Sequence, residues 1–499
     1  QKWMSTDGLT MWCVFSVYGD GAKKGIGGHD KFNLVKATLT LLSNEDYGQT
    51  SRDNDRIQIY KENPRYWQYK GKPLLLLGGS DDDNLFQWTG ARLTEQLDLL
   101  KSIGGNYVRC TMSGRDEGDV WPFKQVNGKY DLDQWDEEYW RRFENFLKLT
   151  HERDIIVQVE IWATYDFYKE RWQRHPFNPK NNMNYSAEQT GLSEQVDHRP
   201  GHSENVFFRS VPAAGNQKTV LKYQRRFVDK MLSHSLKFGH VLYSMDNETA
   251  ATPQWGKYWS EYIQEKAKEA GVVVETTEMW YDHLDKDPPI PHATFDHPET
   301  YSFVDVSQNS HKRGQRHWDS LRLQLSRVDD RVRPLTNVKI YGADTGPERW
   351  FRADVDGVER FWRNIFGGMS SARFHRPPAG LGLGKKAQAN ICSMRMLTNE
   401  MDIFTCVPHN DLLSDRKPNE AYCLANPGKR YAVYFPNGGE VVLDIGLLKK
   451  LATIRWLEIS NGKWKKPQEL KPAQSVTLRP PESGTWVALL VEEAVESKI

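Results

Sequence analysis

Short apolar runs alternate with amphipathic stretches between residues 72 and 376. The runs have the length and side-chain types of buried strands, and the stretches between them place apolar residues three or four positions apart, as a helix face does. The predicted strands are residues 73–78, 107–110, 155–162, 241–245, 272–275, 302–306, 337–341 and 371–374. The predicted helices are residues 93–103, 132–152, 219–238, 255–269, 318–327 and 357–366. This alternation predicts an α/β fold with a parallel sheet.

A (β/α)8 TIM barrel with enlarged loops is the arrangement that these strands predict. The main alternative is a doubly wound open sheet, which carries a Gly-rich phosphate turn after an early strand. The stretch Gly78-Gly-Ser-Asp-Asp82 follows the first predicted strand and has acidic side chains where that turn needs backbone amides. We therefore expect the barrel.

The pattern changes after about residue 420 to short alternating strands separated by Asn-Gly turns, which predicts a small antiparallel β-sandwich. These strands are residues 431–435, 440–444, 453–457, 475–478 and 486–490. Residues 11–18 and 32–42 also have strand character. We predict a strand-rich N-terminal extension over residues 1–62, a barrel over 63–415 and the C-terminal β-sandwich over 416–499.

The composition narrows the possible functions. Lys plus Arg number 67 against 66 Asp plus Glu, so there is no basic field for nucleic acid. No apolar run is long enough for a membrane span. The five cysteines form no C-x-x-C pair, and no His-x-His or His-Glu-x-x-His motif occurs, so we expect neither a metal nor another cofactor. Aromatic residues reach 12%, with 18 Trp, which suits stacking against sugar rings as well as core packing.

Polar and aromatic residues gather where the predicted strands end, which is where TIM barrels carry their chemistry. Such a ring suits a poly- or oligosaccharide, although Arg373 and His375 could instead pair with the surrounding carboxylates. The candidate substrate-binding residues are Asp82, Trp88, Arg115, Glu160, Trp162, Tyr165, Asn247, Trp280, Gln308, Asn309, Arg373 and His375.

Glu248, directly after Asn247 at the end of the fourth strand, is the candidate proton donor. Glycoside cleavage needs an acid at the leaving oxygen and a second carboxylate across the bond. The acid has to stay protonated near neutral pH, so a raised pKa is expected. The alternative is that the Asn-Glu pair merely begins the next helix.

Asn247-Glu248 after the fourth strand resembles the acid/base signature of the clan A retaining glycosidases. The segment 63–79, beginning Asn63-Pro-Arg-Tyr-Trp, resembles the opening of apiosidase-like barrel hydrolases. The segment 431–464 is similar to the so-called collagen-binding module of that group. The resemblance implies a secreted or periplasmic bacterial enzyme that degrades a plant or algal polysaccharide, with its signal peptide removed before Gln1.

Clan A implies a Glu nucleophile at the end of the seventh strand, but the chain has Asp344 there, with Glu348 four residues on. Glu278, after the fifth strand, is the other candidate for the second carboxylate. A shorter Asp widens the gap between the carboxyl groups, so inversion competes with the retaining route. The departure also leaves open a carbohydrate-binding barrel without catalysis. The long stretch 163–215 is expected to form a substrate-binding wall or a solvated excursion over the barrel flank.

Overall fold

The computed structural model describes residues 2–4, 11–13, 55–199, 205–281, 292–343 and 353–492 of the 499. The chain divides into two compact units, residues 1–48 and residues 49–499. In the first unit, β1 (Lys2–Met4) and β2 (Met11–Cys13) form an antiparallel hairpin. The strand predicted at 32–42 lies outside the described residues.

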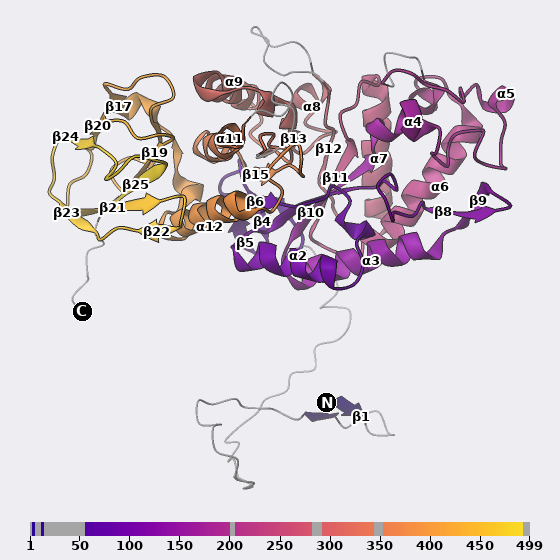
Figure 1. Ribbon diagram of the computed structural model, residues 1–499, viewed down its shortest axis with the longest axis horizontal. Helices are drawn as coiled ribbons and strands as arrows, with labels where there is room; N and C mark the ends of the chain where they lie inside the picture. The colour runs from indigo at the N-terminus through magenta and orange to yellow at the C-terminus, as the bar shows by residue number, and fades with distance from the viewer. Residues whose placement is uncertain are drawn as a thin grey trace. The chain divides into compact units, whose positions relative to one another are not determined.

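Within the described residues, eight parallel strands confirm the predicted barrel (Figure 1). Strands β15, β6, β7, β10, β11 and β12 are hydrogen-bonded in that order, and β13 pairs with β14. A parallel bridge from Ile340 to Phe374 joins the segment after β14 to β15, which closes the series on its first strand. The strands are β6 (Leu76–Gly79), β7 (Tyr107–Thr111), β10 (Ile156–Trp162), β11 (Val241–Asp246), β12 (Thr276–Thr277), β13 (Val304–Asp305), β14 (Leu335–Thr336) and β15 (Ser371–Phe374).

Two strands differ from the prediction. The fifth begins after residue 275 because Val272 still closes the C-terminal turn of the preceding helix, its N–H donating to Ala267 O at 2.9 Å. The seventh ends at Thr336, where side chains take over part of the backbone bonding: Asn337 N donates to Ser371 Oγ at 2.8 Å, and Lys339 N donates to Asn337 Oδ1 at 3.1 Å. Side chains then replace ladder bonds, as where Arg373 Nη1 donates to Val338 O at 2.7 Å.

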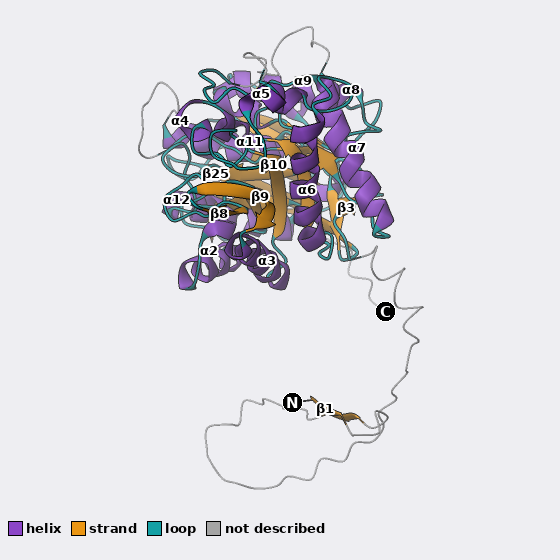
Figure 2. Ribbon diagram, turned by 90° about the vertical axis from the view of Figure 1, so that its right-hand side faces the viewer, coloured by secondary structure: helices purple, strands orange, loops and turns teal. Residues whose placement is uncertain are grey.

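Helices surround the strands (Figure 2). All six predicted helices are present, but the second begins at Glu137 rather than 132. Residues 129–135 belong instead to β9 (Lys129–Trp135), which pairs with β8 (Phe123–Val126), and the Asp136 side chain caps the helix by accepting from Tyr139 N. The main helices are α2 (Ala91–Ser102), α3 (Glu137–Glu152), α6 (Lys218–Ser235), α7 (Pro253–Glu269), α9 (Gly314–Ser326), α11 (Asp354–Phe366) and α12 (Lys385–Glu400). Among the described residues no helix is both long and apolar enough to cross a membrane.

A small antiparallel sheet closes the amino-terminal end of the barrel. It consists of β3 (Gln58–Ile59), β4 (Trp67–Tyr69) and β5 (Lys72–Leu74). Trp67 and Tyr69 pack against the first residues of the barrel strands, among them Leu76 and Leu242. The amino-terminal end of the barrel is therefore apolar, and the polar side chains of the interior lie toward the carboxyl ends of the strands.

The C-terminal strands form the predicted β-sandwich. One sheet contains β16 (Val407–Pro408), β18 (Tyr422–Asn426), β19 (Arg430–Phe435), β25 (Trp486–Glu492), β21 (Ala452–Glu458), β22 (Lys463–Trp464) and β23 (Gln468–Leu470), and the other contains β17 (Leu413–Ser414), β20 (Val441–Asp444) and β24 (Ser475–Leu478). Val433 and Phe435 face the second sheet. Tyr434, on the opposite face, stacks on Trp362 of α11 with ring centroids 5.3 Å apart, so the larger sheet is covered on both faces.

Candidate active site

Glu248 lies two residues beyond the end of β11, on a short turn at the carboxyl end of the barrel. Its φ angle is 60°, a conformation that costs a non-glycine residue free energy and persists only where the surroundings hold it. Asn247 N donates to Trp162 O at 3.0 Å, and Thr249 N donates to Met279 O at 2.8 Å. The turn is therefore fastened to both neighbouring strands.

Both oxygens of the Glu248 carboxylate receive bonds from cationic side chains. Lys339 Nζ donates to Oε1 and also to Asn247 Oδ1, the latter at 2.9 Å. Tyr341 OH donates to Oε1 at 3.3 Å. Arg199 Nη1 donates to Oε2 at 3.1 Å and to the Glu248 main-chain oxygen at 3.0 Å. We call these five residues, Asn247, Glu248, Arg199, Lys339 and Tyr341, the Glu248 cluster.

The charges of the cluster set the protonation of Glu248. Burial raises the pKa of this carboxyl, but the Lys339 ammonium and the Arg199 guanidinium outweigh burial and hold the pKa well below its usual range. Glu248 is therefore ionised in the free protein. The expectation of a raised pKa is wrong, because Lys339 from the seventh strand segment donates directly to the Glu248 carboxylate.

Beneath the cluster the barrel interior is filled by ion pairs. Arg109 donates to Glu160 at 2.7 Å and pairs with Asp83 at 2.8 Å. Glu160 is fully buried, so its carboxylate supports Arg109 and does not face a ligand. Arg373, also fully buried, donates to Ser80 Oγ and to the Val338 carbonyl, which likewise makes it part of the support.

A second polar group lies at the ends of β6 and β15. Asp83 forms an ion pair with Arg376 at 3.2 Å and accepts from Arg115 at 3.4 Å, and His375 Nδ1 lies 3.4 Å away. Asp82 accepts from Trp88 Nε1 at 3.0 Å. The predicted site residues Asp82, Trp88, Arg115 and His375 therefore lie in this group, each beside another polar or charged side chain.

Glu278 faces the helix layer, contrary to its expected place across from Glu248. Its Oε2 accepts from Tyr301 OH at 3.2 Å, and a Cβ added to Gly256 of α7 would lie 2.1 Å from that same oxygen. Trp162 also points outward, packing on Trp259 of α7 at 5.3 Å. Neither residue forms part of the Glu248 cluster.

In its described residues, the stretch 163–215 is a folded insertion with buried side chains, and it contributes Arg199 to the Glu248 cluster. Its short helices are η2 (Thr164–Phe167), α4 (Lys169–Trp172), α5 (Ala187–Thr190) and η3 (Val206–Arg209). Trp172 and Asn178 are fully buried, and Asn178 Nδ2 donates to the carbonyls of Trp172 and Glu194. Half-buried Tyr165 lies between the guanidinium groups of Arg171 and Arg115, at 3.8 and 5.8 Å from its ring centre.

The remaining predicted residues are placed as follows. Trp280 packs edge-on against His292 at 5.0 Å, and Gln308 Oε1 lies 3.2 Å from His311 Nε2. Asn309 is in the short helix η4 (Ser307–His311), and its side chain lies outside the described part of the structure. Asp344 and Glu348 also lie outside the described residues.

The sequence reasoning missed Lys339, Tyr341 and Arg199 as site residues. Lys339 and Tyr341 are two positions apart in the seventh predicted strand, so the strand period would have placed both on one face. Arg199 carries no comparable signal, because it lies in the long insertion, 36 positions after Ala163 and outside every predicted strand and helix. In the described residues, no group of three or more His, Cys, Asp or Glu side chains is arranged to hold a metal ion.

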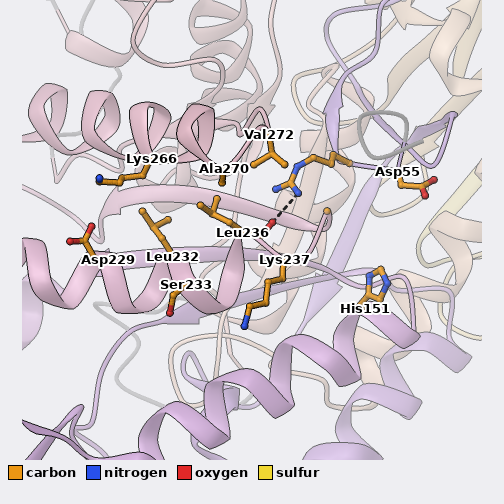
Figure 3. Close-up of a pocket in the computed structure, with 12 residues that line it drawn as sticks. Asp55, His151, Asp229, Leu232, Ser233, Leu236, Lys237, Lys266, Ala270 and Val272 are labelled. Atoms are coloured by element: carbon orange, nitrogen blue, oxygen red, sulfur yellow. Dashed lines mark hydrogen bonds between the residues drawn. The ribbon is translucent and has the colours of Figure 1, made fainter. Parts of the chain in front are cut away.

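A cavity of about 810 Å³ opens at the amino-terminal end of the strands, away from the Glu248 cluster (Figure 3). The ends of α6 and α7 line it, with Leu236 and Val272 among the lining residues. Arg56 donates to the carbonyls of Leu236 and Val273 at 3.2 and 3.1 Å, and so bonds the backbone that follows α6 and α7. This end of a TIM barrel serves stability, and its contacts are of that kind.

Comparison with solved structures agrees with the fold. A glycoside hydrolase family 5 protein from Bacteroides vulgatus is 13% identical, with 89% of this chain and 95% of that chain covered and a TM-score of 0.62. A second glycoside hydrolase is 11% identical over 88% and 97% of the two chains, with a TM-score of 0.62. A noncanonic maltogenic α-amylase from Thermotoga neapolitana is 11% identical over 84% and 99%, with a TM-score of 0.51. At these identities the likeness establishes the barrel fold.

Sequence comparison adds one family. Residues 407–491 match the model described as "Putative collagen-binding domain of a collagenase". The match confirms the predicted C-terminal module, and it begins nine residues before the predicted boundary at 416. Comparison with curated proteins finds no match.

Proposed function

We propose that the protein is a glycoside hydrolase and that Glu248 is one of two carboxylates that react with a sugar. The observation that carries the proposal is a single ionised carboxylate at the carboxyl end of a barrel strand, with both oxygens held by Lys339, Tyr341 and Arg199. The fold shared with glycoside hydrolases supports it.

Glu248 reacts in its ionised form in this proposal. A carboxylate flanked by two cations is a poor proton donor, since its proton would have to be taken up against their field. The same environment suits attack on the anomeric carbon, where the carboxylate approaches a developing positive charge. The role that we propose is therefore the nucleophile of a retaining reaction, in place of the proton donor.

Asp344 is the proposed proton donor at the leaving oxygen. It follows the segment that carries Lys339 and Tyr341, three residues beyond Tyr341. Glu278 is not proposed, because its carboxyl packs over Gly256 on the helix side of the barrel wall. The substrate that we propose is a plant or algal polysaccharide or oligosaccharide, cleaved outside the cell or in the periplasm by an apiosidase-like enzyme, as the resemblance of residues 63–79 implies.

Leaving-group dependence tests the two roles. A panel of plant and algal polysaccharides first identifies a cleaved linkage, from which a matching dinitrophenyl glycoside is made. A dinitrophenolate leaves without a proton, so Asp344→Asn should cleave the activated glycoside well and the natural bond poorly. Glu248→Gln should lose both activities by at least about 10³-fold, because the attacking group is gone.

Exposed Glu137→Gln, on the surface of α3, is the matched control and should retain full activity. Cleavage of the activated glycoside by Glu248→Gln at the wild-type rate would contradict the nucleophile role. If the wild-type protein binds a saccharide of the panel but cleaves none of them, the carbohydrate-binding barrel is favoured instead. The first-formed anomer, followed by NMR, tests retention directly.

A further inference from the structure

Two buried carboxyl groups lie directly behind the Glu248 turn. Asp246 is the last residue of β11 and Glu278 follows β12, and both are fully buried. Trp255 Nε1 of α7 donates to Asp246 Oδ2 at 2.8 Å, and Tyr301 OH donates to Glu278 Oε2 at 3.2 Å. The backbone of α7 approaches so closely at Gly256 that a side chain there would overlap the Glu278 carboxyl.

The two carboxyl groups face adjacent residues of α7, Asp246 at Trp255 and Glu278 at Gly256, and are close neighbours of each other. Asp246 Oδ1 and Glu278 Oε1 are buried, and no N–H or O–H among the described residues donates to either oxygen with good hydrogen-bond geometry. The hydroxyl of Thr164 near Asp246 and the indole N–H of Trp280 near Glu278 are the further polar neighbours. Two buried carboxylates in contact repel strongly, whereas one proton held between them satisfies both remaining oxygens.

We propose that Asp246 and Glu278 share a proton and that this carboxyl pair positions Glu248. Asp246 stands two residues before Glu248, so the pair fixes the start of the turn. Glu278 opens the segment whose next residues bond the end of the turn: Thr249 N donates to Met279 O, and Tyr281 N donates to Thr249 O at 2.9 Å. The shared proton thus joins the two strands between which Glu248 is held at its positive φ.

The carboxyl pair makes the folded protein less stable at neutral pH than at acidic pH. A cost to stability of this kind is common for residues that serve a functional site. Burial raises the pKa of Asp246 to about 7 and that of Glu278 well above its usual value. The folded protein therefore binds more protons than the unfolded chain, and stability falls as pH rises from about 4 through 7. Among the described residues, the titratable group packed against the pair is Tyr301, whose phenol pKa is raised by burial and by Glu278.

Two replacements of Glu278 separate the hydrogen bond from volume. Glu278→Gln keeps an N–H donor toward Asp246 without a titrating proton, and Glu278→Met fills similar space with no donor. Glu275→Gln is the control, since Glu275 is a buried carboxyl before the same strand that bonds Ser302 instead. The kinetic readout rests on the proposed glycosidase function.

The pair predicts a fall of kcat at alkaline pH in the wild type and in Glu275→Gln, where the shared proton is lost. Glu278→Gln should keep kcat within about threefold at pH 7 and lack this fall. Glu278→Met should lose at least tenfold in kcat with KM changed less than threefold. Equal losses in the Gln and Met variants, or an alkaline profile of Glu278→Gln identical to the wild type, would overturn the positioning role.

Infrared difference spectra between pH 5 and pH 10 test the proton without activity. Other buried carboxyls with a raised pKa, such as Asp119, also contribute protonated C=O bands, so the wild-type spectrum is compared with that of Glu278→Gln. A protonated carboxyl C=O band at neutral pH should be lost in Glu278→Gln and kept in Glu275→Gln. If Glu278→Gln loses no such band, the shared proton is overturned. A present band in a protein that cleaves no glycoside leaves the shared proton intact and rejects the proposed function, and with it the positioning of a reacting carboxylate.

Discussion

Replacing Lys339 with methionine removes the ammonium group that donates to Glu248 Oε1 and to Asn247 Oδ1. Unit charges about 4 Å apart at an effective dielectric constant near 20 attract by about 4 kcal/mol. Arg199 remains and water can enter beside Glu248, whose side chain is 16% exposed, so part of that attraction is recovered. We expect the pKa of Glu248 to rise by about 1 to 3 pH units, or about 1.4 to 4 kcal/mol.

The direction of the pH dependence follows from the lowered pKa of Glu248 in the folded protein. Its contribution to stability is complete above the unfolded value of about 4.3 and is lost as pH falls through the lower folded value. In Lys339→Met, both this loss and the acid limb of kcat/KM should move to higher pH. Exposed Lys466→Met is the control and should leave the limb in place.

The assay is the pH dependence of kcat/KM, because this quantity reports ionisations of the free enzyme. Thermal unfolding at each pH separates loss of activity from loss of fold. An acid limb at the same pH in Lys339→Met and the wild type would show that Lys339 does not lower the pKa of Glu248.

Other expected outcomes follow from the contacts around the cluster. Arg199→Met should move the acid limb in the same direction as Lys339→Met but by a smaller amount, because Arg199 is partly exposed and screened by solvent. A larger movement would mean that Arg199, not Lys339, has the greater effect on the pKa of Glu248. Gly256→Ala should destabilise the protein by about 1–3 kcal/mol in urea unfolding, because its methyl would overlap the Glu278 carboxyl, and an unchanged midpoint would contradict that packing. Trp362→Ala should cost about 3–5 kcal/mol by the same measurement, since it removes a buried ring stacked on Tyr434, and a cost below about 1 kcal/mol would mean that the sandwich is not anchored there.

The outline of the fold could be predicted because it depends on local patterns. Apolar runs and helical periodicity located six helices and the approximate places of eight strands, and Asn-Gly turns located the sandwich. The errors arose where residues that are not sequence neighbours of the predicted element decide its bounds. Residues 132–135 joined a hairpin with residues 123–126, and the seventh strand stopped where the Asn337 side chain took over a backbone bond.

Placing Glu248 at the carboxyl end of the fourth strand also needed only local reasoning. The orientation of Glu278 did not follow in the same way, because strand alternation assigns faces only to residues within the paired strand. The fifth strand is Thr276–Thr277, so Glu278 lies just beyond it, and its carboxyl is on the side toward α7.

The order of the elements, the end of the barrel with the polar residues and the position of Glu248 at that end all follow from local sequence patterns. The charge state of Glu248 depends on contacts that form only in the folded chain. Lys339 and Arg199 lie 91 and 49 positions from Glu248 and reach it only because the barrel closes and the long insertion folds back. Electrostatic interactions depend on distance in space and on burial, and neither is written in the spacing of residues along the chain.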